Sequence, residues 1–218
     1  MPKTAPRNTG CPDPGKDCPL CPRLVEFRVK NRVKFPDKWN APVPSFGPEN
    51  GELLVVGLAP GLKGANFSGR PFTGDYAGEL LYSSLLKFGF AEGKYDARPD
   101  DGLRLKNCRI TNAVRCVPPE NKPTPQEMKQ CLAFLQTEMA ALKNVKVILS
   151  LGLISHNSVL KAVGQKISAH KFAHNAVHDL GKVKLIDSYH CSRYNTQTKR
   201  LTTEMFHDVF RKIKDLLR

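Results

Sequence analysis

The stretch that decides the fold runs from Leu53-Leu-Val-Val-Gly-Leu-Ala-Pro-Gly61 to Arg70-Pro-Phe-Thr-Gly-Asp75. Four apolar residues lead into glycines and a proline, and an amphipathic segment begins at about Tyr76. A buried strand, a glycine-rich turn and a helix in this order are typical of an α/β protein. The glycines at positions 57, 61, 64 and 69 indicate that the backbone itself approaches another group closely.

Two further polar segments give this junction a meaning. They are Ile110-Thr-Asn-Ala-Val-Arg-Cys116 and Ser188-Tyr-His-Cys-Ser-Arg-Tyr-Asn195, and each begins at the carboxyl end of a predicted strand. Open α/β sheets bind their ligands at the carboxyl ends of the strands. We therefore expect three polar loops to meet at one rim of the sheet and to form an active site.

Apolar runs and helical periodicity alternate along most of the chain. Strands are predicted over residues 53–56, 109–112, 146–149 and 183–186. Helices are predicted over about 76–88, 125–142, 153–163 and 202–217. The second helix opens with a capping box formed by Thr124 and Glu127. Short β-rich runs separated by helices predict an α/β fold with a single four-stranded parallel sheet flanked by helices on both faces.

The N-terminal part of the chain has a different composition. Residues 1–17 are rich in Pro, Gly, Lys and Asn, and we expect a loose N-terminal arm ahead of one domain over residues 18–218. Residues 24–50 carry many basic residues and prolines, so mostly extended or looped structure is predicted there. Trp39, the only tryptophan, is interpreted as a plug that packs this segment onto the body of the protein.

The charge of the chain indicates a polyanionic partner. Its 218 residues include 34 Lys and Arg against 20 Asp and Glu, a net charge of +14, with an ordinary apolar content of 40%. Nucleic acid is favoured over a membrane surface, because no basic amphipathic anchor stands out. No apolar run is long enough to span a bilayer, and the N-terminus has no apolar signal-peptide core. We expect a cytoplasmic monomer.

Seven cysteines without a secretion signal argue against a disulfide framework and raise the question of a metal. Cys18-Pro-Leu-Cys21 offers two thiols at the spacing that a single metal or cluster accepts, and Cys116 and Cys131 are separated by fourteen residues. A zinc ribbon has two such Cys-x-x-Cys pairs, whereas this chain has one. Four cysteines from distant segments favour an iron–sulfur cluster, ahead of zinc and of no metal. Left out of the ligand set are Cys11, Cys108 and Cys191.

Several motifs, in order along the chain, resemble those of one known family. They are Gly57-Leu-Ala-Pro-Gly61, Gly69-Arg-Pro-Phe-Thr-Gly-Asp75, Thr111-Asn-Ala-Val-Arg-Cys-Val-Pro-Pro119 and His190-x-Ser-Arg-x-Asn195, together with the four cysteines. Over roughly residues 18–215 the chain resembles the iron–sulfur uracil-DNA glycosylases, and within them the family-5, type B branch. Leu58 carries part of this resemblance. Other branches have a polar residue there that activates water, whereas the type B branch has an apolar one.

The resemblance implies a fold, a cofactor and an activity. The fold is a four-stranded parallel sheet with flanking helices, and the cofactor is a [4Fe–4S] cluster on Cys18, Cys21, Cys116 and Cys131. The activity is base excision repair, in which uracil and other deaminated bases are flipped out of damaged duplex DNA and released by hydrolysis of the N-glycosidic bond. Whether single strands also serve as substrates stays open.

The chain departs from the pattern of the branch in two places. The branch usually has Asn-Arg-Thr-Gly where this chain has Asn66-Phe-Ser-Gly69, so a cationic contact to DNA or substrate is missing. The branch usually has His-Pro-Ser where this chain has His190-Cys-Ser192, so the third loop loses the rigidity of a proline.

Four residues are expected to bind the flipped base: Gly57, Leu58, Phe72 and Asn112. Phe72 is the candidate stacking platform, a contact that is worth roughly 1–3 kcal/mol per base; its alternative is ordinary core packing. Asn112 can donate and accept hydrogen bonds, as a bidentate contact to a pyrimidine edge requires. Its alternative is to cap its own loop.

The cleavage step is assigned to two residues. Breaking the bond leaves negative charge on the base and positive charge on the sugar. His190 can donate a hydrogen bond to the developing anion. Asp75 can orient the attacking water or offset the sugar cation, which Leu58 cannot do. The alternative for Asp75 is to cap the following helix, and the two roles are compatible.

The rest of the third loop is expected to bind DNA. Ser192 can bind phosphate, Arg193 and Tyr194 can fill the gap left by the flipped base, and Asn195 completes the motif. The histidines without such a context are interpreted as surface or packing residues: His156, His170, His174 and His178.

Two other functions stay open at this point. One is a non-catalytic protein that binds lesions or abasic sites and keeps the same fold and cluster, a hypothesis suggested by the two altered motifs. The other is a zinc-stabilised nucleic-acid-binding module without a base pocket.

Overall fold

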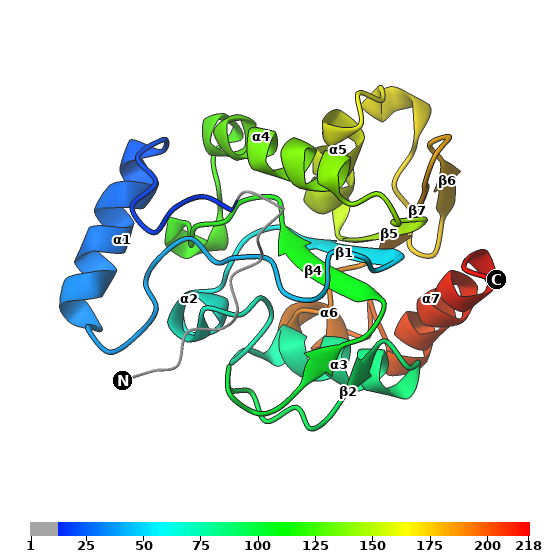
Figure 1. Cartoon of the computed structure of the whole chain (residues 1–218), viewed down its shortest axis with the longest axis horizontal. Coiled ribbons are helices and arrows are strands. Elements are labelled where there is room, and N and C mark those ends of the chain that lie inside the picture. Colours follow the sequence, from blue (N-terminus) through cyan, green and yellow to red (C-terminus); the bar gives the residue numbers. More distant parts are fainter. Residues whose placement is uncertain (1–12) are drawn as a thin grey trace.

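A mixed five-stranded sheet forms the centre of the computed structural model, in which residues 13–218 are described (Figure 1). The strand order is β4 (Cys108–Asn112), β1 (Leu53–Gly57), β5 (Val147–Leu151), β7 (Lys184–Ser188) and β6 (Val177–Asp179). The first four strands are parallel and correspond to the four that the sequence predicts. Cys11 and most of the predicted arm over residues 1–17 lie outside the described residues.

The prediction of a wholly parallel four-stranded sheet is wrong at one edge. β6 runs antiparallel to β7 and pairs Val177 with Ile186 and Asp179 with Lys184. It has three residues, of which the first and the last are exposed. A strand this short and this polar lacks the apolar run by which the other four can be recognised in the sequence.

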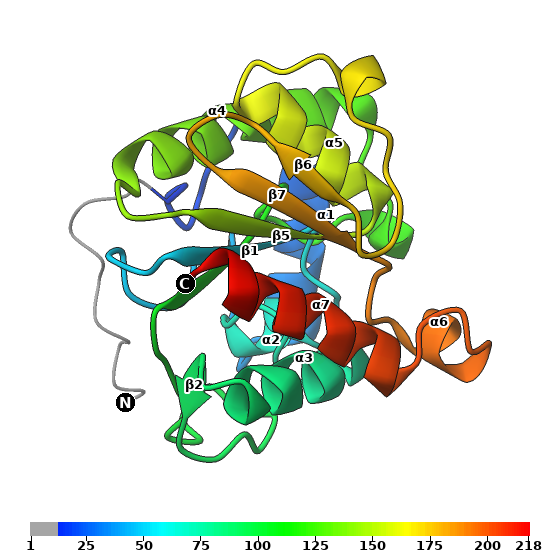
Figure 2. The same cartoon turned by 90° about the vertical axis from the view of Figure 1, so that its right-hand side faces the viewer.

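Helices cover both faces of the sheet (Figure 2). α3 (Tyr76–Lys87) and α7 (Thr203–Leu216) lie on one face, and α4 (Pro125–Ala141) and α5 (Leu153–Ala162) lie on the other. In β1, Leu53 and Val55 belong to the core with α3 and α7, whereas Leu54 and Val56 belong to the core with α4 and α5. Successive side chains of a strand point to opposite faces, so a strand covered on both faces is apolar throughout.

A helix at the N-terminal side is a second departure from the prediction. α1 (Pro22–Lys34) occupies part of the segment that we expected to be extended or looped. Its buried residues, Leu24, Arg28 and Asn31, recur at helical spacing, but two of the three are polar. Hydrophobic periodicity is the main signal of a helix in a sequence. It fails here because the inward face of α1 is polar.

Shorter elements complete the fold. They are α2 (Ala65–Ser68), α6 (Arg193–Gln197), two single 3₁₀ turns (Pro119–Asn121 and Ile167–Ala169), and a two-stranded sheet of β2 (Ala91–Glu92) and β3 (Arg104–Leu105). The capping box that opens α4 is present as predicted, with Thr124 and Glu127 as its two members. Among the described helices, none has the length and apolar content of a membrane span.

A buried ionic network joins α4 to the edge strand β4. Glu138 of α4 accepts hydrogen bonds from Arg109 (2.7 Å), Thr111 (2.8 Å) and Arg115 (2.5 Å). The side chains of Glu138, Arg109 and Arg115 are each 1% exposed. Arg115 also forms an ion pair with Asp13, at 2.7 Å, which ties the first described residues to the body.

Candidate active site and cysteine cavity

The carboxyl ends of β1 and β4 bring Gly57, Asn112 and Phe72 together. Gly57 pairs with Asn112 in the sheet. A Cβ atom on Gly57 would lie 2.3 Å from Oδ1 of Asn112 and 2.6 Å from Cζ of Phe72, distances at which real atoms clash. Only glycine lets the Asn112 amide and the Phe72 ring approach this strand end so closely. The predicted close approach of the backbone is therefore found here.

Asn112 ends β4 with an acceptor that has no partner. Its side chain is buried, with 3% of the residue exposed. Among the described residues, none forms a hydrogen bond with its Oδ1. Buried polar atoms almost always have partners, and leaving one unpaired costs about 1–3 kcal/mol. The structure therefore holds a ready acceptor beside Phe72, and the alternative of a loop cap is not seen for this oxygen.

Phe72 is held in an uncommon backbone conformation. Its φ of 52° lies in the left-handed region, which a bulky residue rarely adopts. The hydroxyl of Tyr95 donates to the Phe72 carbonyl oxygen (3.2 Å), and the hydroxyl of Tyr82 donates to that of Pro71 (2.6 Å). Such strain persists only where the surroundings enforce it, and it concentrates at functional sites.

A buried ion pair fixes the loop that carries Phe72 and Asp75. Arg70 donates to both carboxylate oxygens of Asp101, at 2.8 and 2.7 Å, and to Oγ1 of Thr73 at 2.7 Å. The side chains of Arg70 and Asp101 are 5% and 0% exposed. The guanidinium also lies 5.3 Å from the ring centroids of Phe46 and Tyr82. We refer to this Arg70–Asp101 pair and its aromatic neighbours as the arginine clamp.

Asp75 caps α3, as one of its two predicted roles requires. Its Oδ1 accepts a hydrogen bond from the Gly78 N–H, at 3.2 Å. Its Oδ2 faces Gly64, where an added Cβ would lie 2.4 Å from that oxygen. Burial raises the pKa of Asp75, and the N–H groups of Gly78 and Ala77 only partly offset this rise. The carboxylate is thus a stronger base than an exposed aspartate and has one oxygen outside the cap.

His190 lies opposite Phe72 at the end of β7. The centroids of the two rings are 6.1 Å apart, at an interplanar angle of 30°. Burial lowers the pKa of His190 to about 4, so the imidazole is neutral near pH 7. The Cβ of His190 lies 3.6 Å from where a side chain on Gly152 would begin, so the β5 and β7 ends also approach closely.

The residues after His190 form α6 and its cap. The Ser192 hydroxyl accepts from the Asn195 N–H, at 3.4 Å. The side-chain nitrogen of Asn195 donates to the His190 carbonyl oxygen (2.8 Å), and this hydrogen bond holds the loop. The guanidinium of Arg193 lies 5.3 Å from the ring centroid of Tyr76, and Tyr194 is 70% exposed. DNA binding by Ser192, Arg193, Tyr194 and Asn195 stays a prediction.

The four cysteines predicted as ligands line one cavity, together with Leu24, Val114 and Phe134. Arg28 extends into it and donates to Sγ of Cys116 at 3.8 Å, and the Arg115 N–H donates to Sγ of Cys131 at 3.3 Å. Nε of Arg28 is buried without a partner among the described residues. A cationic, hydrogen-bonded and otherwise apolar cavity with four thiols fits an anionic group ligated by sulfur.

Burial raises the pKa of two of these thiols strongly. The pKa of Cys21 rises to about 11 and that of Cys116 to about 12, with the nearby Cys131 adding to both shifts. Without a cation, the thiols of Cys21 and Cys116 are therefore neutral at pH 7. A metal must displace their protons before it can bind.

A family model named for the uracil DNA glycosylase superfamily matches residues 44–214. The chain belongs to the uracil-DNA glycosylase superfamily. It is 44% identical to the type-5 uracil-DNA glycosylase of Thermus thermophilus, over 91% of this chain and 93% of that protein. The type-5 enzyme of Pyrobaculum aerophilum is 38% identical, over 90% of this chain and 87% of that protein. The type-4 enzyme of the same organism is 33% identical, over 69% of this chain and 63% of that protein. The resemblance to the type-5 branch is confirmed.

The structure explains one of the two departures from the pattern of the branch. Phe67 packs its ring against Phe35, directly after α1, with the centroids 4.8 Å apart. The position that usually carries a cation thus joins α2 to the end of α1. Cys191, which stands where a proline is usual, is completely buried. Leu58 is half-buried beside Gly57, and its carbonyl oxygen accepts from the Val114 N–H at 2.9 Å.

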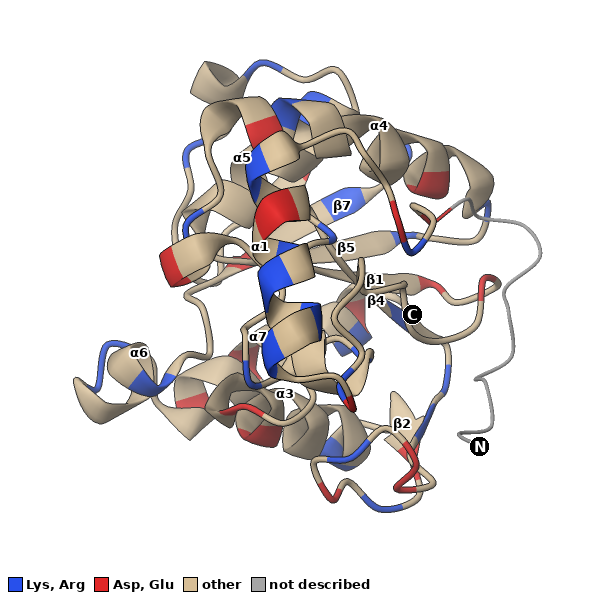
Figure 3. Ribbon diagram, turned by 90° about the vertical axis from the view of Figure 1, so that its left-hand side faces the viewer, with Lys and Arg blue, Asp and Glu red and all other residues tan. Residues whose placement is uncertain are grey.

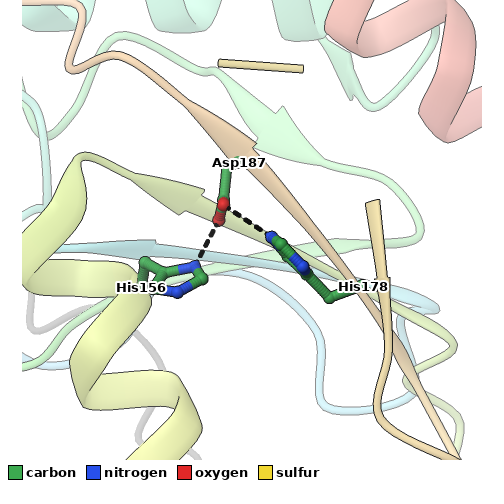
Figure 4. Close-up of side chains that lie close together, drawn as sticks. All are labelled: His156, His178 and Asp187. Atoms are coloured by element: carbon green, nitrogen blue, oxygen red, sulfur yellow. Dashed lines mark hydrogen bonds and ion pairs between the residues drawn. The ribbon is translucent and has the colours of Figure 1, made fainter. Parts of the chain in front are cut away.

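Sequence reasoning missed a cluster of polar side chains behind the His190 loop. His156, His178 and Asp187 come from α5, β6 and β7 and lie in mutual contact (Figure 4). His174 accepts a hydrogen bond from the Tyr189 N–H at 3.2 Å, one residue before His190. No motif links these positions in the sequence, because β6, which brings His178 to Asp187, is the strand that the sequence does not reveal.

Proposed function

We propose that this chain excises uracil from DNA, the substrate that the names of its type-5 relatives state. The observation that carries the proposal is the unpartnered, buried Oδ1 of Asn112 beside Phe72. A flipped uracil carries an N–H that can donate to this oxygen and a neighbouring carbonyl that can accept from the amide nitrogen. Binding the base would therefore give a hydrogen-bond partner to an oxygen that has none among the described residues, while the Phe72 ring stacks on the base.

His190 acts on the leaving base. Because the low pKa keeps its imidazole neutral at pH 7, it donates through an N–H and does not carry a full charge. The developing anion is stabilised by this preorganised donor, a contribution of about 2.7–4 kcal/mol for a comparable oxyanion donor. The Asn195 amide, bonded to the His190 carbonyl oxygen, keeps the loop in place.

Asp75 acts on the water and the sugar. Its position as the cap of α3 fixes the carboxylate, and its raised pKa makes it a better proton acceptor than an exposed aspartate. Negative charge on Asp75 also offsets the positive charge that develops on the sugar. Leu58 contributes no polar side-chain atom, which leaves Asp75 to activate the water.

The cysteine cavity is proposed to hold a [4Fe–4S] cluster on Cys18, Cys21, Cys116 and Cys131. Three thiolates around one zinc ion, at Zn–S distances of about 2.3 Å, lie about 3.8 Å apart. In the described part of the chain, no three of these sulfur atoms come within 4.8 Å of one another, which favours the larger cluster. The cluster would join α1, the segment after β4, and α4.

The metal content tests the cluster. Anaerobically purified protein is expected to be brown and to contain about four iron atoms per chain, as a cubane on four cysteines requires. Stoichiometric zinc without iron would remove this part of the proposal and leave the proposed excision of uracil standing.

DNA contact is proposed to extend from the site to α1. This helix carries five basic residues against one acidic residue, Glu26. Figure 3 marks Lys and Arg residues along α1, of which Arg23, Lys30 and Lys34 are exposed. α1 is joined to α2, the helix after the β1 turn, through Phe35 and Phe67. Phosphate contacts make binding depend on salt, so the logarithm of affinity should fall linearly with the logarithm of salt concentration. A DNA affinity that does not change with salt would show that the positive charge of the protein does not serve DNA binding.

The function itself is tested with duplexes that carry uracil, hypoxanthine or xanthine. Alkali-labile abasic sites should form on the uracil duplex, and the other two measure the range of bases. Asn112→Ala should abolish most of this activity, whereas Asn144→Ala should not, because Asn144 is an exposed residue in the turn between α4 and β5. Binding to the lesion without release of the base would support the alternative, a non-catalytic lesion or abasic-site binder. A cytoplasmic location and a monomeric state stay predictions.

A further inference from the structure

The cluster of His156, His178 and Asp187 lies outside the active site. Nδ1 of His156 is 2.8 Å from Oδ1 of Asp187, and Nε2 of His178 is 2.9 Å from Oδ2. The two imidazoles approach the two carboxylate oxygens from different sides (Figure 4). All three ligand atoms lie within 4.8 Å of one another. The side chains of His156 and Asp187 are fully buried, and that of His178 is 11% exposed.

The hydrogen bonds of His156 require a positive charge between it and Asp187. Its Nε2 lies 2.9 Å from the His170 carbonyl oxygen, which can only accept, so Nε2 carries a hydrogen. Its Nδ1 faces a carboxylate oxygen, which also only accepts when ionised. In a neutral imidazole, two lone pairs would face each other at this point. At 2.8 Å a second proton fits between them, whereas a metal ion bonded to both atoms at about 2.0–2.2 Å would lie to one side of the N···O line.

The neighbours of the cluster are those that surround metal ligands in proteins. A histidine that binds a metal usually donates its other ring N–H to a carbonyl or carboxylate, and a ligating carboxylate is itself hydrogen-bonded. Here His156 donates to the His170 carbonyl oxygen, and the Ser150 hydroxyl donates to Oδ1 of Asp187 at 2.6 Å. Two imidazoles and one carboxylate are a ligand set that suits zinc.

We propose that His156 Nδ1, His178 Nε2 and the Asp187 carboxylate bind one zinc ion. Binding releases the proton that His156 shares with Asp187, and the ring proton of His178 moves from Nε2 to Nδ1. The ion joins α5 and the edge strand β6 to β7, the strand that continues into Tyr189 and His190. Its role is structural, because it fixes the base of the loop that carries the catalytic imidazole.

The test uses the full chain with the proposed [4Fe–4S] cluster already bound in its cysteine cavity. The protein is equilibrated with zinc, freed of excess metal, and measured for zinc content and for X-ray absorption at the zinc edge. We expect about one zinc per chain, with nitrogen and oxygen ligands at about 2.0–2.2 Å and no sulfur at about 2.3 Å. Sulfur ligands would show that the zinc had entered the cysteine cavity, and an absence of retained zinc would leave only a hydrogen-bonded triad; either result overturns the proposal.

The variant His178→Gln sharpens the test without leaving a cavity in the protein core. His178→Gln, on the short edge strand, keeps a donor toward Asp187 but replaces a good ligand with a poor one. Loss of an outer-shell partner already weakens metal binding about 10–100-fold, so this loss of a ligand should weaken zinc binding at least tenfold. His207→Gln is the matched control, because His207 lies on α7 and packs against Phe88. Equal zinc affinity in His178→Gln and the wild type would contradict the proposal.

Discussion

The two loops that carry Asp75 and His190 are held by different chemistry. The first is fixed by the arginine clamp, in which a guanidinium meets a buried carboxylate and aromatic rings. The second is held by a neutral imidazole and an amide, with His174 accepting from the Tyr189 N–H and Asn195 donating to the His190 carbonyl oxygen. The loop of one proposed catalytic group is thus supported by groups that stay ionised, and the loop of the other by groups that must stay neutral.

The pKa values show what this difference does. Burial alone would raise the pKa of Asp101, but hydrogen bonds from Arg70 and from two backbone N–H groups lower it to about 2. Burial lowers the pKa of His174 and brings that of His190 to about 4. Between about pH 4 and pH 6.5 the charges of the clamp are therefore unchanged. In the same range the histidines of the second loop bind fewer protons in the folded chain than in the unfolded chain. Acid should therefore destabilise the loop that carries His190 and leave the loop that carries Asp75 unchanged.

The largest effect expected concerns Asp75. Asp75→Asn keeps an oxygen to cap α3 but removes the proton acceptor, so single-turnover release of uracil should slow about 100–10,000-fold. Affinity for DNA should stay nearly unchanged, because a carboxylate adds nothing favourable to phosphate binding. Wild-type rates in Asp75→Asn would show that the water is activated elsewhere.

The next effect concerns the clamp. Asp101→Asn leaves the Arg70 guanidinium buried without its counter-charge, which should lower the free energy of unfolding by about 3–5 kcal/mol. Asp96→Asn is the matched control in the same segment, because its pair with Arg98 is exposed and should contribute at most about 1 kcal/mol. Urea denaturation of both variants at pH 7 measures this difference. Similar losses in the two would mean that the clamp does not fix the loop.

The third prediction concerns acid. The pKa of His190 is about 4 in the fold, below its ordinary value of 6.5, so the unfolded chain takes up the proton first as the pH falls. Stability is therefore lost below about pH 6.5 and levels off near pH 4, with a loss of about 2 kcal/mol between pH 7 and pH 5. Comparing wild type with His190→Gln at both values isolates this contribution. An equal acid response in the two would disprove the assignment.

The smallest effect concerns His174. His174→Gln keeps an acceptor for the Tyr189 N–H but cannot take up a proton, so at pH 7 the free energy of unfolding should change by less than about 1 kcal/mol. At pH 5 the variant should lose less stability than the wild type, because the pKa of His174 is lowered in the fold. Denaturation curves at the two pH values test this, and a steeper acid loss in the variant would contradict it.

Most of the sheet could be predicted from the sequence, and most of its support could not. β1 is visible because it is buried on both faces and therefore apolar throughout. α1 is hidden because Arg28 and Asn31 occupy its inward face. The position of α1 depends on hydrogen bonds from Arg28 to Cys18 and Cys116, and hydrophobic periodicity cannot reveal such bonds.

The same division holds for the site. Gly57, Phe72, Asn112, Asp75 and His190 could be named because each stands in a motif at the end of a strand or in the following turn, and the structure brings them to one rim. Their supports could not be named. The partner of Arg70 is thirty-one residues away, and nothing in the surrounding Asp-rich segment distinguishes Asp101 from its exposed neighbours.

Both margins of the sheet are closed to a further strand. Along β4, the segment before β1 pairs with it through Phe46 and Ile110, whose backbone groups exchange two hydrogen bonds. At the other margin, β6 has only three residues, and its last one, Asp179, is exposed and charged. A long bare edge invites pairing with another molecule, and short or covered edges prevent it. Concentrated solutions of the protein should therefore resist the strand-to-strand aggregation to which open sheets are prone.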